Sequence, residues 1–411
     1  MERRDFLKIG SISTVALTLG TRVKAADQDA AGLPNAKQAK PITREEYLER
    51  QETARKYMKD AGISGVLLTG GSSMSYFTGT QWGLSERMFA LVFPHKGEPV
   101  WVVPAFEKGR ALEQIKFGSD IRTWEEDESP YRLVAAALKD RGIATGVLGI
   151  EETVRFVFSD GVAKAAPSLK LTSADAVTAR CRRVKSAHEI ELMRLANQIT
   201  LKSYELSAQS LREGMTHNEL AGKIASAHQQ MGTRGGALVL FAEYSASPHG
   251  TITPQKLKKG DVVLMDGGST IEGYQSDITR TTVFGKPGDK QRRVWDIVKH
   301  AQAAALKAAR PGVACEEVDR AARKVIEDAG FGPGYKYFTH RLGHGIGMDG
   351  HEWTYLVRGN KTPLEAGMTF SNEPGIYIPG EFGVRLEDIM VITEGGAELL
   401  TGQAQSIESP W

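Results

Sequence analysis

Five residues in the C-terminal half of the chain have side chains that could together hold metal ions. Four are carboxylates and one is an imidazole, each in a segment that predicts strand or tight turn: Asp266, Asp277, His344, Glu373 and Glu387. Oxygen-rich donor sets suit hard or borderline divalent cations. Two such cations about 3.5–4 Å apart can generate hydroxide at neutral pH and polarise a carbonyl group. The residue types therefore indicate metal-assisted hydrolysis.

The two aspartates are separated by a glycine-rich segment. Asp266 ends an apolar run, and Asp277 follows eleven residues later. Gly267, Gly268 and Gly273 can supply a chain reversal, so we expect two antiparallel strands that place the carboxylates side by side. Close carboxylates repel each other unless a cation neutralises them. For this pair alone, a loop-capping aspartate beside a surface aspartate is the alternative.

Three of the nine histidines lie in the twelve residues from His340 to His351. The same segment contains four glycines, Gly343, Gly345, Gly347 and Gly350. They argue against a helical pair of zinc-binding histidines and for a backbone that approaches another group closely. We expect one histidine to bind metal and the others to face substrate. The alternative for any one of them is a core histidine with satisfied hydrogen bonds.

Two glutamates complete the set. Glu373 stands at an expected strand end, before the turn signal Pro374-Gly375, and Glu387 follows fourteen residues later within an apolar alternation. A charged side chain at an inward strand position costs several kcal/mol unless it is paired or bound to metal. Asp388 should point to the opposite face. The alternative for Glu387 is a buried ion pair with Arg385.

The chain that positions these residues should fold into more than one domain, because its 411 residues exceed the length at which a single hydrophobic core stops growing. Residues 42–180 alternate helical and strand patterns and predict an α/β domain, with helices at 43–59 and 133–141 and strands at 65–69, 89–93, 100–103 and 146–150. Residues 181–411 predict helices outside a largely antiparallel sheet. These helices lie near 188–212, 217–231, 290–309 and 315–329, with strands such as 262–265 and 390–392.

The first residues predict an export signal of the twin-arginine type. Arg3 and Arg4 precede a short apolar stretch from Ile9 to Gly20, and small residues follow up to Ala25. The stretch is shorter than the ~20 residues that span a bilayer, so we expect residues 1–25 to be a signal and the protein to be periplasmic, without stable membrane insertion afterwards. The alternative is a basic N-terminus that is merely solvated. Residues 26–41 have little periodicity and predict an exposed leader.

Composition excludes several other classes. Hydrophobic residues make up 41% of the chain, charged residues 25%, and the formal net charge is +2, which is ordinary for a globular protein. No basic patch or acidic tail stands out, so nucleic acid is not an expected partner. With only Cys181 and Cys315, a disulfide framework is excluded, although one bridge is not. We expect both thiols to be buried and inert.

In combination, the motifs resemble the metallopeptidase family that includes methionine aminopeptidase, aminopeptidase P and prolidase. The resemblance is carried by the segments Gly273–Thr281, Gly343–Gly347, Asn372–Gly375 and Val384–Asp388. Upstream, Met74–Gly79 and Arg183–Ile190 resemble the N-terminal domain and linker of the branch that contains the Xaa-Pro peptidases and creatinase. The resemblance implies an α+β chain, with a C-terminal pita-bread domain and an N-terminal creatinase-like domain. The extra domain disfavours a methionine aminopeptidase.

The resemblance also implies residue roles. Asp277 and Glu387 would bridge two ions, Asp266 would chelate one, and His344 and Glu373 would bind the other, with Glu373 also handling the proton of a bridging hydroxide. Five residues would surround the substrate: His249, His340, His351, Tyr377 and Arg385. His249 and His351 would act in catalysis, by stabilising the carbonyl oxygen or donating to the departing proline nitrogen. Glycine before His351 departs from the branch's more common pattern and leaves the proline side of the cleft undefined.

The implied activity is hydrolysis of the bond between an N-terminal residue and proline in dipeptides or short peptides. Carboxylate-rich ligation favours Mn²⁺, while Zn²⁺ or Co²⁺ could also fit, and we expect a homodimer. Two alternatives share the fold: a creatinase-like amidinohydrolase that works without metals, and a non-catalytic peptide-binding relative. The complete set of five ligands argues against both.

Overall fold

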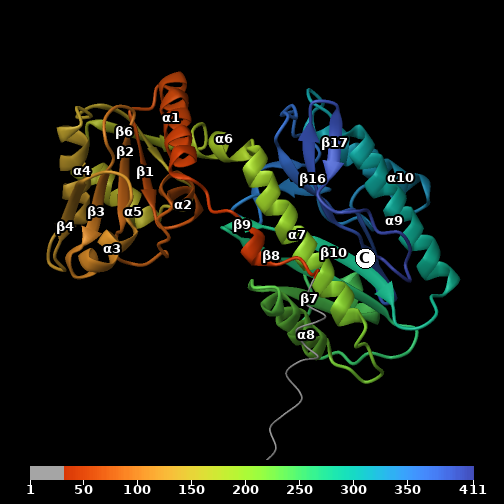
Figure 1. The fold of residues 1–411 in the computed structure, drawn as a ribbon. Coiled ribbons are helices and arrows are strands. Elements are labelled where there is room, and N and C mark those ends of the chain that lie inside the picture. The colour runs from red at the N-terminus through yellow and green to blue at the C-terminus, as the bar shows by residue number, and fades with distance from the viewer. Residues whose placement is uncertain (1–31) are drawn as a thin grey trace, which may run out of the picture. The chain divides into compact units, whose positions relative to one another are not determined.

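The structure is a computed structural model that describes residues 32–411. The expected signal at 1–25 and the first part of the expected leader lie outside these residues. Figure 1 shows an N-terminal region built on one sheet, and a C-terminal region in which helices accompany three further sheets. Within residues 32–411, no helix is both long enough and apolar enough to cross a membrane.

Six strands form the N-terminal sheet, in the order β4-β3-β2-β1-β5-β6. Their bounds are Gly65–Thr69 (β1), Ala90–Pro94 (β2), Val100–Pro104 (β3), Asp120–Trp124 (β4), Gly146–Ile150 (β5) and Leu169–Ser173 (β6). β1 pairs antiparallel with β2 and parallel with β5. Its side chains alternate between two cores, with Val66 and Leu68 in one and Leu67 in the other. The sheet is therefore covered on both faces.

Six helices cover this sheet. They are α1 (Arg44–Ala61), α2 (Ser72–Thr78), α3 (Lys108–Gln114), α4 (Pro130–Asp140), α5 (Phe156–Ala165) and α6 (Thr178–Arg183). α1, α2, α3 and α6 contribute to one core, and α4 and α5 to the other. Thr43 caps α1 together with Glu46, as the sequence predicts. The domain boundary expected at 180/181 falls within α6, whose Cys181 belongs to the N-terminal core.

The four helices predicted for the C-terminal region are present. They are α7 (Ala187–Ala208), α8 (His217–Gln230), α9 (Asp289–Ala308) and α10 (Cys315–Asp328). Ser186 and Glu189 form the predicted capping box of α7. Three short 3-10 helices also occur, η1 (Ala36–Gln38), η2 (Ala105–Glu107) and η3 (Ala242–Ala246). In η1, the Ala36 N–H donates to the Met231 carbonyl at 2.9 Å, which ties part of the expected leader to the end of α8.

Every strand pair in the C-terminal region is antiparallel. The first sheet has the order β10-β8-β7, with β9 on β8, from Gly235–Phe241 (β7), Val262–Ile271 (β8), Tyr274–Gln275 (β9) and Ile278–Val283 (β10). The second has the order β12-β11-β13-β16-β17, from Gly343–Gly345 (β11), Glu352–Leu356 (β12), Thr369–Asn372 (β13), Asp388–Thr393 (β16) and Gly396–Leu399 (β17). β14 (Gly375–Ile378) and β15 (Phe382–Arg385) form a hairpin. The expected α+β class is confirmed.

Each large C-terminal sheet packs against its own helices. α7 and α8 share a core with β7 and β8, whereas α9 and α10 share one with β13 and β16. Met265 of β8 belongs to the first of these cores. Because side chains alternate along a strand, its neighbour Asp266 points to the opposite face, away from α7 and α8. On that face Asp266 meets other polar residues, among them Thr279 and Arg385.

Two local expectations need correction. The reversal between the aspartates is made by Glu272 and Gly273, with φ values of 49° and 89°, so Gly273 takes its expected place there but Gly267 and Gly268 do not. Those two glycines lie inside β8, where a Cβ on Gly268 would stand 1.8 Å from the Ser276 carbonyl oxygen. Glu387 lies not within a strand but in the crossing between β15 and β16.

Both cysteines are buried and unbridged, as expected. Burial raises the pKa of Cys181 to about 12 and that of Cys315 to about 11. Neither thiol is therefore an activated nucleophile.

Candidate metal centre

The five predicted metal ligands come together from five separate segments. They are Asp266 in β8, Asp277 between β9 and β10, His344 in β11, Glu373 after β13 and Glu387 between β15 and β16. Donor atoms of Asp266, Asp277 and Glu387 lie within 4.8 Å of one another, and so do those of His344, Glu373 and Glu387. Glu387 belongs to both groups. The residues thus form two adjacent donor sets that share one carboxylate.

Strand register explains the first donor set. β8 and β10 are paired so that Asp266 faces Thr279, and Thr279 follows Asp277 by two residues on the same chain face. The Thr279 hydroxyl lies 2.7 Å from Asp266 Oδ1 and 2.6 Å from Glu387 Oε2. This hydroxyl therefore links two predicted ligands. Sequence reasoning did not assign Thr279, although its i+2 spacing from Asp277 was a signal for it.

The backbone at Glu387 is also held in place, by Arg280. The buried Arg280 donates to the Glu387 backbone carbonyl at 2.7 Å and forms an ion pair with Asp388 at 2.6 Å. Asp388 therefore points away from Glu387, as the alternation predicted. The pairing fixes the crossing between β15 and β16 through a fully buried charge pair.

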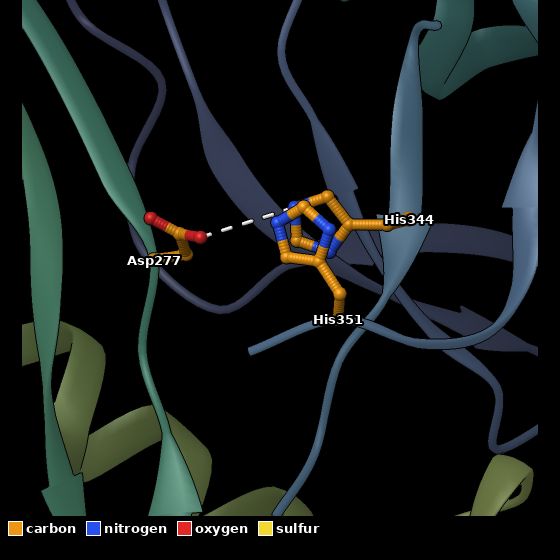
Figure 2. Close-up of side chains that lie close together, drawn as sticks. All are labelled: Asp277, His344 and His351. Carbon is orange, nitrogen blue, oxygen red and sulfur yellow. Dashed lines mark ion pairs between the residues drawn. The ribbon is translucent and has the colours of Figure 1, made fainter. Parts of the chain in front are cut away.

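His344 presents one ring nitrogen to the carboxylates. Its Nδ1 lies 3.1 Å from the Gly345 carbonyl, so Nδ1 carries the proton and Nε2 is left as the acceptor. Nε2 lies 3.3 Å from Glu373 Oε1 and 3.8 Å from Asp277 Oδ2, the second contact being drawn in Figure 2. Burial, followed by His351 and Arg341, lowers the pKa of His344 to about 3. A neutral imidazole with a free Nε2 is the form that binds metal.

Three of the carboxyl groups have pKa values raised well above their usual range. For Asp277 the causes are burial and then Asp266 and Glu373, and for Glu387 they are burial and then Asp277 and Asp266. Burial and Glu387 do the same for Glu373. So many carboxylates in one buried place repel each other, and divalent cations among them would remove that repulsion. The donor set therefore fits two hard or borderline cations.

Arg385 does not form the ion pair with Glu387 that we considered. Its Nη2 pairs with Asp266 Oδ2, its Nε donates to the Thr279 hydroxyl at 3.0 Å, and its Nη1 donates to the Tyr377 hydroxyl at 2.8 Å. The Tyr377 hydroxyl lies 2.7 Å from His340 Nε2. Three residues predicted to face substrate thus form one hydrogen-bonded chain that ends on a predicted metal ligand.

His340 already has partners on both ring nitrogens. Its Nδ1 lies 2.8 Å from the Arg341 carbonyl, and its Nε2 is held by Tyr377. Burial and then Arg385 lower its pKa to about 3. In this structure, the neutral His340 therefore orients Tyr377.

His351 is more exposed and lies against His344. The two rings are stacked, with centroids 3.7 Å apart and planes at 13° (Figure 2). Donor atoms of His351, His344 and Asp277 also fall within 4.8 Å of one another, so a second imidazole is close enough to reach an ion. His249 is exposed, in the segment between η3 and β8, and its charge would lower the pKa of both His340 and His351.

Close approach of a neighbouring group explains three of the four glycines in the histidine-rich segment; at Gly347 a Cβ would lie 2.7 Å from Lys185 Cε. A Cβ on Gly343 would lie 2.0 Å from the Ser371 carbonyl oxygen, and one on Gly345 would lie 2.7 Å from that of Glu352. The Ser371 hydroxyl bonds to the His344 N–H at 2.9 Å and to Glu373 Oε1 at 3.2 Å, a role that sequence reasoning missed. A Cβ on Gly350 would meet nothing within 4 Å, so close approach does not explain that glycine.

Fold and site together define a hydrolase of the metallopeptidase class. Residues 191–394 match Metallopeptidase family M24, and residues 50–184 match the Creatinase/Prolidase N-terminal domain. The chain is 37% identical over 359 residues to the probable dipeptidase PepE of Mycobacterium tuberculosis, covering 86% of this chain and 94% of that protein. This chain belongs to the M24 family of metallopeptidases.

Solved structures agree with this assignment. The dipeptidase PepE from Mycobacterium ulcerans has a TM-score of 0.83 and 35% identity, covering 90% of this chain and 99% of that one. The Xaa-Pro dipeptidase from Bacillus anthracis has a TM-score of 0.76 and 30% identity, covering 89% and 98%. The resemblance to the prolidase branch and the pita-bread fold are thereby confirmed, and the protein is a peptidase.

Proposed function

We propose that this protein is an exopeptidase that hydrolyses the bond between an N-terminal residue and proline, with dipeptides as its main substrates. The observation that carries the proposal is Glu387, whose carboxylate belongs to two adjacent donor sets. The similarity to a dipeptidase and to an Xaa-Pro dipeptidase supports the peptide class and the short substrate. Proline selectivity rests on the similarity alone.

Two divalent cations fit the donor sets. Asp266 would hold one ion, His344 and Glu373 would hold the other, and both ions would share Asp277 and Glu387, since donor atoms of Asp277 lie near those of Asp266 and Glu387 and also near those of His344. When bound, such ions lower the pKa of water towards neutrality and polarise a carbonyl oxygen. The excess of carboxylates over imidazoles favours Mn²⁺, with Zn²⁺ and Co²⁺ as alternatives.

The chain itself supplies the proton chemistry and the positioning. Glu373 is mostly buried, and its Oε1 accepts from the Ser371 hydroxyl; we assign it, as the family resemblance implies, to accept and return the proton of the attacking water. Burial lowers the pKa of His351, so its ring is neutral at neutral pH and can donate one N–H to the developing oxyanion. We assign His249, on the exposed rim, to the same oxygen or to the departing nitrogen. The nitrogen of an Xaa-Pro bond carries no hydrogen, so it must receive a proton as the bond breaks.

The test compares Ala-Pro with Ala-Pro-Ala after chelation and after re-addition of Mn²⁺, Zn²⁺ or Co²⁺ singly. We expect chelation to abolish activity, Mn²⁺ to restore it best, and Ala-Pro to be cleaved faster than the tripeptide. Activity that survives chelation would overturn the metal mechanism and favour a creatinase-like reaction. Failure to cleave either peptide with any ion would reject the proposed selectivity for the bond before proline.

We also propose that the protein is exported by the twin-arginine route, that residues 1–25 are then removed, and that the mature protein is a homodimer. The paired Arg3 and Arg4 with the short apolar stretch motivate the route. Replacing both arginines by lysine should retain the protein in the cytoplasm, which cell fractionation would detect. Light scattering of the purified protein would measure the oligomeric state.

A further inference from the structure

His351 stands at the end of an irregular segment that both of its flanks tie down. Residues 346–351 connect β11 to β12 without belonging to a strand. Among the described residues, the His351 ring takes part in no hydrogen bond to another side chain, whereas Asp349 and Glu352 on either side of it have several. Apart from its stacking on His344, the His351 ring is held through the backbone that these two neighbours anchor.

Glu352 closes the segment onto itself. Its Oε1 accepts the backbone N–H groups of Met348 at 2.9 Å and Asp349 at 3.1 Å. A single carboxylate oxygen thus holds the chain three and four residues upstream, so His351 lies inside a closed loop. Glu352 is 6% exposed, so water does not compete well for these bonds.

Two cations near the boundary between the domains hold the same carboxylate. Arg182, near the end of α6, pairs with Glu352 Oε1, and Lys185 donates to Oε2 at 2.9 Å. Both cations are buried, with side chains 6% and 2% exposed. Arg182 also donates to Asp349 Oδ2 at 2.6 Å. We call these four residues, Arg182, Lys185, Asp349 and Glu352, the Glu352 cluster.

The cluster continues into the N-terminal domain. Arg182 donates to the Ser73 hydroxyl at 3.1 Å, and Ser73 donates to Glu151 at 2.8 Å. The Ser72 hydroxyl is hydrogen-bonded to Asp349. The N-terminal domain contains all three of these residues, with Ser72 and Ser73 in α2 and Glu151 just after β5. The metal centre belongs to the C-terminal domain. A continuous set of hydrogen bonds therefore runs from the N-terminal domain to both flanks of His351.

A nearby ion pair also joins α6 to the C-terminal region, but it does not hold the 346–351 segment. Arg183, the next residue of α6, pairs with Glu365 at 2.8 Å. Glu365 is half exposed, and its side chain touches no part of the 346–351 segment in the hydrogen bonds of the described residues. Glu352 and Glu365 thus both accept from an arginine of α6, but only Glu352 also accepts backbone N–H groups of the 346–351 segment.

We propose that the Glu352 cluster is a positioning device, which fixes His351 beside His344 and makes the N-terminal domain a working part of the active site. The consequence for turnover rests on the proposed function, in which His351 contacts the reacting carbonyl. Loss of the cluster should leave the five metal ligands in place, because none of them bonds to it. It should slow the chemical step more than substrate binding, because misplacing a catalytic group by about 1 Å can cost 10²-fold.

The experiment compares Glu352→Gln with Glu365→Gln as the matched control, in the full chain. Three quantities are measured: kcat and KM on Ala-Pro with saturating Mn²⁺, bound metal, and backbone hydrogen exchange of residues 346–352. For Glu352→Gln we expect kcat to fall about 10- to 100-fold, KM to change far less, metal content to stay at the parental value, and exchange in 346–352 to accelerate. Glu365→Gln should match the parent in all three.

Each outcome decides. Parental kcat and parental exchange in Glu352→Gln overturn the proposal, and so does a loss of metal that accounts for the lost activity. If the parent itself does not cleave Ala-Pro, the proposed function fails, while the exchange measurement still tests the positioning. Should Glu352→Gln not fold, Lys185→Met is measured instead, because it removes one cation and leaves the pairing of Arg182 with Glu352. We expect kcat to fall and exchange to accelerate in this variant too, by smaller amounts. Parental values of both would again reject the role of the Glu352 cluster.

Discussion

Arg385 forms its ion pair with Asp266, a predicted metal ligand, and not with its strand neighbour Glu387. The guanidinium is nearly fully buried and also donates to Thr279 and Tyr377. One positive charge thus lies beside a group of four carboxylates. It compensates part of their repulsion and at the same time orients Asp266 and Tyr377.

Replacing Arg385 by methionine should destabilise the metal-free protein more than the metal-loaded protein. Removing one partner of a buried ion pair costs about 3–5 kcal/mol because the remaining charge is left uncompensated, whereas bound cations would take over that compensation. Thermal unfolding with chelator and with Mn²⁺ measures both values. Lys290→Met, which breaks an exposed pair with Glu381, is the control and should change neither. Equal destabilisation in both states would contradict the account.

Asp277→Asn and Glu387→Gln should each abolish activity while the fold is retained. Each removes a charge that we assign to both ions. The same substitutions relieve repulsion among the carboxylates, so the metal-free variants should unfold at a higher temperature than the metal-free parent. Metal analysis and unfolding curves of each variant beside the parent provide the check. Full activity with one ion missing would refute the two-ion account.

Stability of the metal-free protein should fall as pH rises above the carboxyl range. Asp277, Glu373 and Glu387 have folded pKa values raised above 3.8, 4.5 and 4.5. Above those values the unfolded chain has released protons that the folded chain still binds, so the free energy of unfolding decreases with pH until the folded groups ionise. Saturating Mn²⁺ should flatten this slope between about pH 5 and 8.

A control for that slope lies within the same protein. Although burial opposes it, Lys185 and Arg182 lower the pKa of Glu352 to about 2. Its stabilising contribution is present above the unfolded value of 4.5 and is lost only as pH falls towards about 2. Glu352→Gln should therefore leave the slope between about pH 5 and 8 unchanged. A slope without dependence on metal would show that the three clustered carboxyl groups do not cause it.

His351→Ala should lower turnover far more than metal content. The ring stacks on His344 and comes close to Asp277, but the two donor sets that share Glu387 are complete without it. We expect a fall in kcat of about 10²-fold with two ions retained. Loss of an ion in this variant would show that His351 is a ligand, and that His344 is not the sole imidazole of the site.

Two glycines of the same segment should respond differently to alanine. Gly343→Ala would place a methyl group 2.0 Å from the Ser371 carbonyl oxygen and should destabilise the fold by about 1–3 kcal/mol. Gly350→Ala meets nothing within 4 Å and should be nearly neutral. Urea unfolding of the two variants measures the difference. Similar stabilities would mean that β11 and β13 can move apart at little cost.

That the five candidate ligands converge could be predicted from the sequence, because several of them have an unusual local setting. Asp266 ends an apolar run within β8, Glu373 precedes a proline-glycine turn, and Glu387 is charged within an apolar stretch. Helix starts at Thr43 and Ser186 were readable because a capping box is a local pattern. The edge strands β4 and β6 were missed because their residues are largely half-buried or exposed and carry no strong apolar alternation.

Partnerships between distant residues could not be predicted. Two such partnerships are Arg385 with Asp266 and Arg182 with Glu352. Both depend on how separate helices and strands pack together, which no local spacing in the sequence encodes. The same holds for Gly267 and Gly268, whose need for close packing arises from neighbouring strands rather than from a turn. Thr279 was within reach, since it shares a strand face with Asp277.

The five donors come from segments 121 residues apart at their extremes, Asp266 and Glu387, and on separate sheets. An unfolded chain does not hold them in one place, so ion binding is coupled to folding of the C-terminal region. Under the export route proposed above, a chain that folds before export would bind its ions in the cytoplasm. The cations it carries would then reflect the metal supply of the compartment in which it folds rather than that of its destination.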